Sequence, residues 1–269
     1  MSTQDTIYST GKYQTPAHVH PSATQGIVSP KAHTAVIILA GGTGERFGRV
    51  GGKQLVVVEG HPILSWTIAA FDAVADVAQI VVVCPEVRHE EFLKNAIDPY
   101  DFKTTIVLAS AGTTRQESAF SGMQAVAENA SLVALHDGAR PLVTPLLIEH
   151  VINSLKGNFD ADGAIVATPA IDTLKVVQNG KIVGTPDRSV FYNAQTPQVF
   201  RKEIYARAQA SALKDGFLAT DDAALIERMG GTVLVVEGSR DNIKLTVPED
   251  YDVVSAVIQR TLFDAKIKE

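Results

Sequence analysis

The chain has 269 residues, of which 45% are hydrophobic and 20% are charged, and its formal net charge is -6. A chain of this length buries roughly 75% of its unfolded surface, so a sizeable core is possible, and the acidic balance argues against a mainly basic nucleic-acid-binding protein. The single cysteine, Cys84, excludes an intramolecular disulfide framework and a cysteine-rich zinc site. No apolar stretch approaches the ~18 residues of a membrane span, so we expect a cytoplasmic protein without membrane association.

Residues 1–33 differ in composition from the rest of the chain. They contain three prolines and nine serines or threonines, and they show no apolar periodicity. This composition predicts a disordered N-terminal tail. A targeting peptide or a histidine-rich metal site is less favoured, because the segment lacks arginine, an apolar core region and cysteine partners.

From Thr34 onward, short apolar runs alternate with helical stretches, and residues 34–269 are expected to form one domain. The predicted strands are 36–39, 80–83, 105–108, 132–135, 163–167 and 232–236. The predicted helices are 62–74, 86–96, 115–128, 145–155, 203–213, 221–229 and 248–263. Continuous apolar strands between helices indicate a mainly parallel sheet covered on both faces, which is a Rossmann-like α/β fold. Ligands are then expected at the carboxyl ends of the strands.

Residues 171–197 interrupt this alternation. A strand over 173–177, a turn at Asn179-Gly180 and a strand over 181–183 predict a β-hairpin. A hairpin inserted in an α/β domain often projects as an arm. Because such a hairpin buries little within its own chain, it is marginally stable alone, which favours contact with a second subunit.

The first predicted strand leads into a glycine-rich loop that contains Gly41, Gly42, Thr43 and Gly44. Glycines let the backbone approach a ligand closely, and successive N–H groups can surround phosphate oxygens. The loop departs from the dinucleotide fingerprint and from the Walker A loop, both of which need a small residue where Phe47 stands. Arg46 and Lys53 suit a polyphosphate with its metal ion, although two solvated surface cations would give the same pattern.

Five segments together resemble one family of enzymes. They are the loop from Leu39 to Gly48 followed by Lys53-Gln54, Arg115-Gln116-Glu117-Ser118, His136-Asp137-Gly138-Ala139-Arg140-Pro141, Thr220-Asp221-Asp222-Ala223 and Asp241-Asn242-Ile243-Lys244-Leu245-Thr246. The resemblance is to the 2-C-methyl-D-erythritol 4-phosphate cytidylyltransferases and covers about residues 34–260. One departure is Gly52, where the family usually has proline before the lysine, and this change is expected to loosen the loop while leaving Lys53 in register.

The resemblance implies that methylerythritol phosphate attacks the α-phosphorus of CTP, which yields a CDP-linked polyol and pyrophosphate in the non-mevalonate isoprenoid pathway. It assigns catalysis to Arg46, Lys53, Arg188 and Lys244. It assigns nucleotide binding to Ala40, Gly41, Gly42, Thr43, Gly44, Arg115, Ser118, Asp137 and Gly138. It assigns binding of the polyol phosphate to Asp137, Arg140, Thr173, Arg188 and Lys244. It also implies Mg²⁺, bound mainly through the CTP phosphates with Asp137 as a candidate ligand, and a homodimer held by the arm at 171–197.

Simpler interpretations of several of these residues stay open. Ser118 is also typical of an ordinary helix start, and Asp137 with Arg140 of a surface ion pair. Residues 220–222 are best interpreted as a cap of the following helix. His136 is left outside the mechanism, because a phosphate nucleophile needs no strong base near neutral pH.

Three alternative functions fit part of the pattern. A ribitol-5-phosphate cytidylyltransferase shares nearly all of it, and a uridylyl- or guanylyltransferase for sugar 1-phosphates fits the late segments poorly. The third alternative is a nucleotide-binding module that has lost activity. The presence of all the expected cations, with Asp137, argues against this last alternative.

Overall fold

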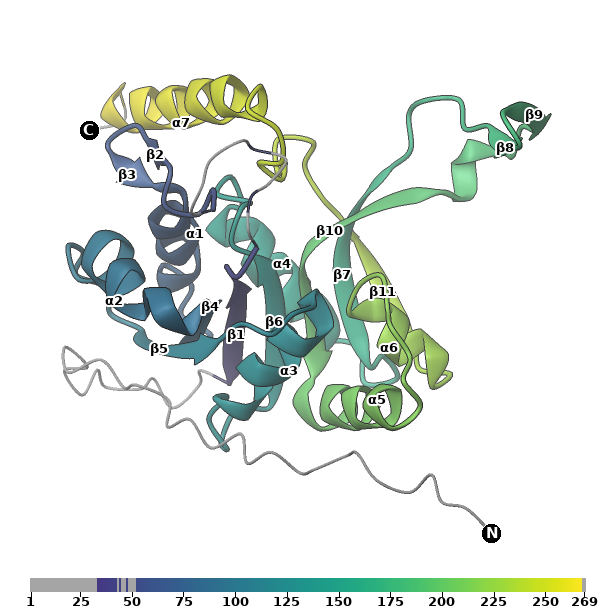
Figure 1. Cartoon of the computed structure of the whole chain (residues 1–269), viewed down its shortest axis with the longest axis horizontal. Coiled ribbons are helices and arrows are strands. Elements are labelled where there is room, and N and C mark those ends of the chain that lie inside the picture. Colours follow the sequence, from purple (N-terminus) through teal and green to yellow (C-terminus); the bar gives the residue numbers. More distant parts are fainter. Residues whose placement is uncertain (1–32, 43, 45–46, 48–51, 268–269) are drawn as a thin grey trace, which may run out of the picture.

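A computed structural model describes residues 33–42, 44, 47 and 52–267 of the chain (Figure 1). Residues 1–32 of the expected tail lie outside the described residues. Seven strands form the central sheet, in the order β11-β7-β10-β6-β1-β4-β5. Their bounds are β1 Thr34–Leu39, β4 Val77–Cys84, β5 Thr105–Ser110, β6 Leu132–Asp137, β7 Gly163–Pro169, β10 Tyr192–Arg201 and β11 Val233–Glu237. All neighbouring pairs are parallel except those of β10, so the predicted mainly parallel sheet is confirmed.

The antiparallel strand β10 was not predicted, and residues 192–197 were assigned to the arm instead. Its sequence lacks an apolar run because three of its buried residues are polar: Gln195, Thr196 and Gln198. These side chains are hydrogen-bonded to neighbouring segments, which satisfies them inside the protein. Because these buried residues are polar, β10 has no continuous apolar run from which the sequence could predict a strand.

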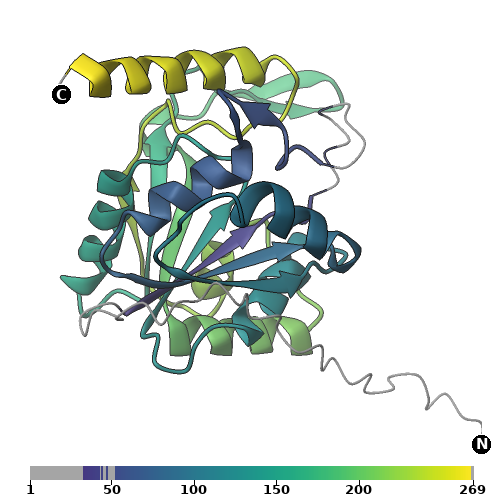
Figure 2. The same cartoon turned by 90° about the vertical axis from the view of Figure 1, so that its left-hand side faces the viewer.

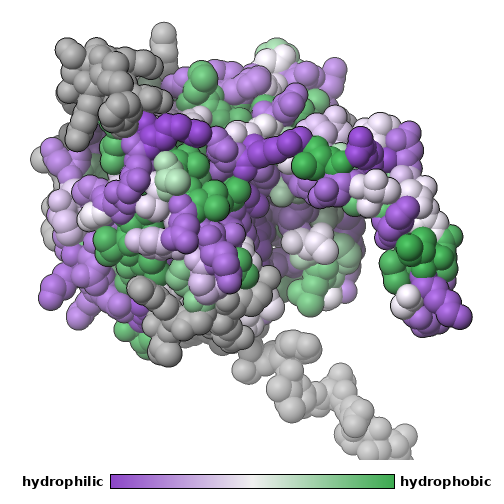
Figure 3. Space-filling view, turned by 90° about the horizontal axis from the view of Figure 1, so that it is seen from above, coloured by the Kyte–Doolittle hydropathy of each residue, from purple (hydrophilic) through white to green (hydrophobic). Residues whose placement is uncertain are grey.

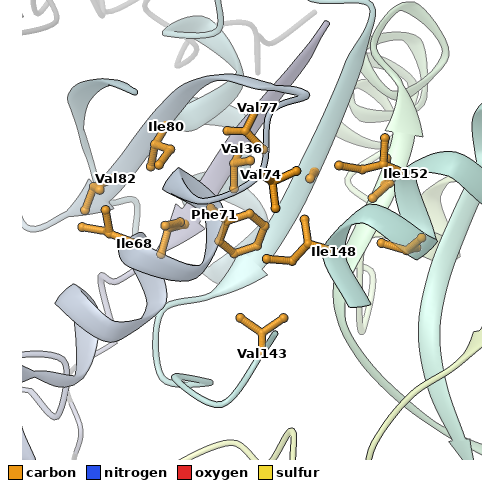
Figure 4. Packing of buried hydrophobic residues seen from close by; sticks show 14 of the residues in the cluster. Val36, Ile68, Phe71, Val74, Val77, Ile80, Val82, Val143, Ile148 and Ile152 are labelled. Carbon is orange, nitrogen blue, oxygen red and sulfur yellow. The ribbon is translucent and has the colours of Figure 1, made fainter. Parts of the chain in front are cut away.

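Helices cover both faces of the sheet, as the sequence predicts. One face carries α1 (Ile63–Asp72), α2 (His89–Phe92) and α4 (Pro145–Lys156), and the other carries α3 (Arg115–Gln124), α5 (Lys202–Lys214) and α6 (Ala223–Arg228). Because successive strand residues point to opposite faces, Val36 and Ile38 pack under the first group and Ile37 under the second. Figure 4 shows part of the first core, where Phe71 of α1 lies among Val36, Val74 and Ile148.

The predicted helix over 86–96 consists of three shorter pieces. A 3-10 turn, η2 (Glu86–Arg88), leads into α2, and a wider turn, η3 (Leu93–Ile97), completes it. The helix predicted to begin at Arg115 does begin there, because Thr114 and Glu117 form a reciprocal cap of α3. This cap places Arg115 in the first turn of α3, at the edge of the sheet where the strands end.

The C-terminal helix α7 (Asp250–Ile267) lies across one end of the molecule, next to the small sheet of β2 (Val57–Val58) and β3 (His61–Pro62) (Figure 2). A third apolar cluster fills the space beneath it and includes Val58, Leu245 and Val254. Burial of Leu245 fixes the segment that carries Lys244. Among the described residues, none of the helices has the length and hydropathy needed to cross a membrane.

The predicted hairpin is present and projects from the main body (Figure 1). Its strands are β8 (Val176–Gln178) and β9 (Lys181–Gly184), followed by a 3-10 turn, η4 (Arg188–Val190). The first strand begins three residues later than predicted, so Thr173 precedes it. From Tyr192 onward the chain returns to the sheet as β10, where Tyr192 pairs with Pro169 of β7.

Candidate active site

The site begins where two parallel strands end side by side. Leu39, the last residue of β1, is in register with Asp137, the last residue of β6. The N–H of Gly138 donates to the carbonyl of Leu39 at 3.0 Å, and a Cβ atom on Gly138 would lie 3.3 Å from the Cβ of Ala40. Glycine at this position therefore lets the turn after β6 close onto the start of the glycine-rich loop.

The glycine-rich loop is described in part. Gly41 packs against the end of β5 so closely that a Cβ atom would lie 2.4 Å from the Cβ of Ala111. Gly44 has a φ of +72°, in the left-handed region that favours glycine. Gly42 is exposed, and its carbonyl accepts a hydrogen bond from Gln54 at 3.4 Å. Thr43 and Arg46, both expected at the nucleotide, lie outside the described residues.

Gly52, which stands where the family usually has proline, has a φ of +82°. Proline is fixed near a φ of about -65° and cannot adopt this conformation. A Cβ atom on Gly52 would also lie 2.6 Å from Oε1 of Gln54. Glycine therefore lets the backbone at residue 52 adopt a conformation that proline cannot. The half-buried Lys53 is the next residue along the chain.

Asp137 is surrounded by three cationic side chains. Nζ of Lys244 lies 3.0 Å and Nε of Arg140 3.3 Å from Oδ2 of Asp137, and Nε of Arg115 lies 3.8 Å from Oδ1. Burial would raise the pKa of Asp137, but the charges of Lys244, Arg115 and Arg140 override burial and hold this pKa well below its ordinary range. The carboxylate therefore stays ionised, and the cluster carries a local excess of positive charge suited to anionic ligands.

The segment after β11 is tied to the turn after β6, which explains how Lys244 reaches Asp137. Nη1 of Arg140 donates to the carbonyl of Asn242 at 2.7 Å, and the N–H of Leu245 donates to the carbonyl of Ala139 at 2.8 Å. Lys244 was expected on a strand-like segment. It lies instead on irregular backbone between β11 and α7, because its neighbours bond to a turn rather than to a strand.

His136 is buried beneath the turn that carries Asp137 and Arg140. Burial lowers the pKa of His136 to about 4, so the ring is neutral near pH 7. Nδ1 of the ring lies 3.1 Å from Oγ1 of Thr196, which accepts from the N–H of Asp137 at 3.0 Å, and Nε2 lies 3.2 Å from the carbonyl of Arg140. The ring thus braces both ends of the turn that carries Asp137 and Arg140.

Arg115 lies between two carboxylates. Besides its contact with Asp137, its Nη1 lies 2.6 Å from Oδ2 of Asp222, a residue that is buried at the start of α6. The sequence interpretation gave residues 220–222 a capping role. Asp221 has that role, because its Oδ1 accepts from the N–H of Ala224, but the side chain of Asp222 makes no capping bond. No spacing signal connects residues 115 and 222, so the pair was missed.

Ser118 is buried under the turn that precedes α3. Its hydroxyl accepts from the N–H of Gly112 at 3.1 Å and donates to the carbonyl of Thr114 at 2.9 Å. In the described structure Ser118 therefore orders the loop after β5, which borders Gly41 through Ala111. Ser118 would therefore act on nucleotide binding by fixing the position of this loop.

The two expected residues of the arm are separate from the cluster. Thr173 and Arg188 are exposed, and Arg188 bonds to the carbonyl of Ile171 through Nη1. Within the described part of the chain, neither forms a hydrogen bond or ion pair with Asp137, Arg140 or Lys244. The structure brings four of the expected side chains together, namely Arg115, Asp137, Arg140 and Lys244, and leaves the arm residues apart from them.

The donor set also bears on the expected Mg²⁺. The described residues contain no group of three or more histidine, cysteine or carboxylate side chains that could hold a metal ion by themselves. Mg²⁺ commonly uses one or two carboxylates with substrate phosphates and waters. A single ionised Asp137 beside the glycine-rich loop fits that second arrangement, in which the nucleotide supplies most of the ligands.

A mainly parallel α/β sheet with a cluster of cationic side chains at the carboxyl ends of β1 and β6 is the arrangement expected of a nucleotidyltransferase. The family model described as IspD, 2-C-methyl-D-erythritol 4-phosphate cytidylyltransferase, matches residues 34–260. The chain belongs to this family.

Individual relatives agree with this assignment. The 2-C-methyl-D-erythritol 4-phosphate cytidylyltransferase of Syntrophotalea carbinolica is 43% identical over 83% of this chain and 95% of its own length. The protein of the same name from Bacillus licheniformis is 39% identical over the same shares. A crystal structure of 4-diphosphocytidyl-2C-methyl-D-erythritol synthase from Anaerococcus prevotii has a TM-score of 0.75 at 31% identity, covering 85% of this chain and 99% of that one.

Proposed function

We propose that this protein transfers CMP from CTP to 2-C-methyl-D-erythritol 4-phosphate and releases pyrophosphate. The observation that carries the proposal is the group of Lys244, Arg140 and Arg115 around the ionised Asp137, next to the glycine-rich loop. The substrate phosphate is itself the nucleophile, so no covalent enzyme intermediate is needed. Two polyanions must approach in line while charge gathers on the α-phosphoryl oxygens, and fixed cations favour both events.

Each of the expected site residues has a role in this proposed reaction. Arg46 and Lys53 stabilise the charge that develops on the triphosphate, and the backbone from Ala40 to Gly44 surrounds it. Lys244 positions the attacking phosphate, and Arg140 contributes to the same subsite. Arg115 and Gly138, with the loop that Ser118 orders, border the nucleoside.

Mg²⁺ fits this site as part of the nucleotide complex. Asp137 would hold the ion together with the triphosphate oxygens, and the ion would neutralise phosphate charge. Asp137 is also the common partner of Lys244 and Arg140, which lie 3.0 and 3.3 Å from its Oδ2.

The proposal includes a homodimer in which the arm of one subunit completes the site of the other. The hydrophobic side chains of the arm support it, because Val177 and Ile182 are 56% and 65% exposed and Phe191 is 42% exposed. Figure 3 shows hydrophobic surface near the end of the projecting arm. Exposed apolar groups of this kind mark an interaction surface. A partner's arm would bring Arg188 and Thr173 to the polyol phosphate, because among the described residues of their own chain they make no contact with Arg140 or Lys244.

The proposed function is tested by measuring pyrophosphate release. The purified protein is incubated with Mg²⁺ and CTP, UTP or GTP, each with methylerythritol phosphate or ribitol 5-phosphate. Release only with CTP and methylerythritol phosphate, abolished by EDTA, is the expected result. Preference for ribitol 5-phosphate would favour the alternative cytidylyltransferase, and no release in any mixture would indicate a binding module.

We place this reaction in the cytoplasm, where CTP is available.

A further inference from the structure

Asp222 is a buried carboxylate that the proposed reaction does not use. It is 2% exposed and lies at the start of α6, on the face of the sheet that α3 and α5 cover. Its Oδ2 lies 2.6 Å from Nη1 of Arg115, whereas Oδ1 of Asp137 lies 3.8 Å from Nε of the same guanidinium. Arg115 is therefore held more closely by a residue outside the site than by the carboxylate within it.

Two elements, α5 and β10, fix the position of Asp222. Its Oδ1 accepts from the hydroxyl of Tyr205 on α5 at 2.5 Å, and this hydroxyl accepts from Gln209 at 3.0 Å. Its backbone N–H donates to Oε1 of Gln198 on β10 at 3.2 Å. Tyr205 is fully buried, and burial raises the pKa of its hydroxyl well above the ordinary value, so the hydroxyl remains a donor. A carboxylate bonded in this way has little freedom to follow Arg115.

The arrangement has an electrostatic consequence for the site. Asp137 already has Lys244 and Arg140 within 3.0 and 3.3 Å of one oxygen. Without Asp222, the guanidinium of Arg115 would be balanced by Asp137 alone and would be drawn toward it. Burial raises the pKa of Asp222, while the charge of Arg115 and the hydroxyl of Tyr205 favour its ionised form. The carboxylate of Asp222, 2.6 Å from Arg115, thus keeps the guanidinium at the start of α3, next to the loop after β5, and leaves Asp137 less fully paired.

We propose that Asp222 is a positioning residue for CTP, which holds the guanidinium of Arg115 at the nucleotide subsite, and that Tyr205 fixes Asp222 in turn. The proposal rests on the proposed role of Arg115 in nucleotide binding. It assigns to residue 222 an effect on CTP that is separate from the polyol phosphate, because Asp222 contacts Arg115 and neither Arg140 nor Lys244.

The test compares Asp222→Asn with Arg115→Gln and with the double variant. Asp222→Asn keeps the shape of the side chain and removes its charge. We expect the KM for CTP to rise about tenfold or more, with the KM for methylerythritol phosphate changed less than about twofold. In the Arg115→Gln background, Asp222→Asn should add nothing further to the KM for CTP, because both changes remove the same interaction.

Two further variants separate positioning from stability. Asp76→Asn removes another ion-paired carboxylate, which bonds to Thr34 and Lys156 at the opposite end of the sheet, and it should leave both KM values unchanged. Tyr205→Phe keeps the charge of Asp222 but frees its Oδ1, and it should raise the KM for CTP about threefold. If Asp222→Asn does not fold, Tyr205→Phe in the two Arg115 backgrounds decides the question.

Four results would overturn the proposal: an unchanged KM for CTP, an equal rise in both KM values, additive effects in the double variant, or no effect of Arg115→Gln itself. The last result would refute the role of Arg115 in an active enzyme. It differs from failure of the proposed function, in which the unaltered protein releases no pyrophosphate at all.

Discussion

At the scale of single residues, the carboxylate of Asp137 determines where the cations converge. Arg140 is close to it in the sequence, and the pair was predictable from the segment His136–Pro141. Lys244 was assigned to the site only through the family resemblance, and the partner of Arg115 was missed altogether. The reason is physical, because an ion pair between distant residues leaves no periodicity in either segment.

The charge of Lys244 is open to direct test. Lys244→Gln removes a cation 3.0 Å from Asp137 and is expected to lower kcat at least ~100-fold, since a fixed cation would no longer meet the developing phosphate charge. The side chain is 39% exposed, so the melting temperature should change little. Lys214→Gln, at an exposed lysine near the end of α5, serves as the control. A Lys244→Gln enzyme with normal turnover would remove this residue from the mechanism.

His136 predicts a pH dependence of stability. Its pKa is about 4 in the folded protein and about 6.5 when unfolded, so the unfolded chain binds the proton first as pH falls. Its contribution is complete above pH 6.5 and is lost between pH 6.5 and 4. Between pH 7 and pH 5 the wild type should lose about 2 kcal/mol more unfolding free energy than His136→Gln. Urea titrations in EDTA would measure this difference, and parallel pH profiles would contradict it.

At the scale of elements, the sequence is most informative where strands and helices bury apolar residues. The strands at 36–39, 80–83, 105–108, 132–135 and 163–167 were found in this way, whereas the exposed hairpin was predicted from its turn at Asn179-Gly180. β10 was missed because its buried residues Gln195, Thr196 and Gln198 are polar and serve as hydrogen-bonding partners. The single helix expected over 86–96 was also wrong in detail, since local turns divide it.

The distance between α3 and the sheet depends on Gly122. A Cβ atom there would lie 2.5 Å from Cγ2 of Ile37 and 2.9 Å from Cγ2 of Val83. Gly122→Ala should therefore lower the unfolding free energy by about 1–3 kcal/mol, although alanine is the better helix former. Gly184→Ala, where the nearest atom is 3.9 Å away, should change it by less than about 0.5 kcal/mol. Equal stability of the two variants by urea denaturation would show that α3 does not need this close approach.

At the scale of the whole molecule, the account depends on how the arm meets the site. The main body holds Lys53, Asp137, Arg140 and Lys244, while Arg188 lies on the projecting arm. Because the proposed site needs both parts and they lie apart in one chain, we propose that a second copy completes it. The dimer is thus part of the proposed catalytic arrangement as well as a cover for the apolar arm.

The most direct test is to mix two inactive variants, Arg188→Ala and Lys53→Ala, under conditions that exchange subunits. In a mixed dimer with shared sites, one site carries both defects and the other carries neither, so pyrophosphate release from CTP should recover to about one quarter of the wild-type rate, from half of the dimers with one intact site each. Unmixed variants treated identically give the baseline. If each arm served its own chain, every site would keep one defect, and activity that stays at the baseline after verified exchange would contradict the shared site.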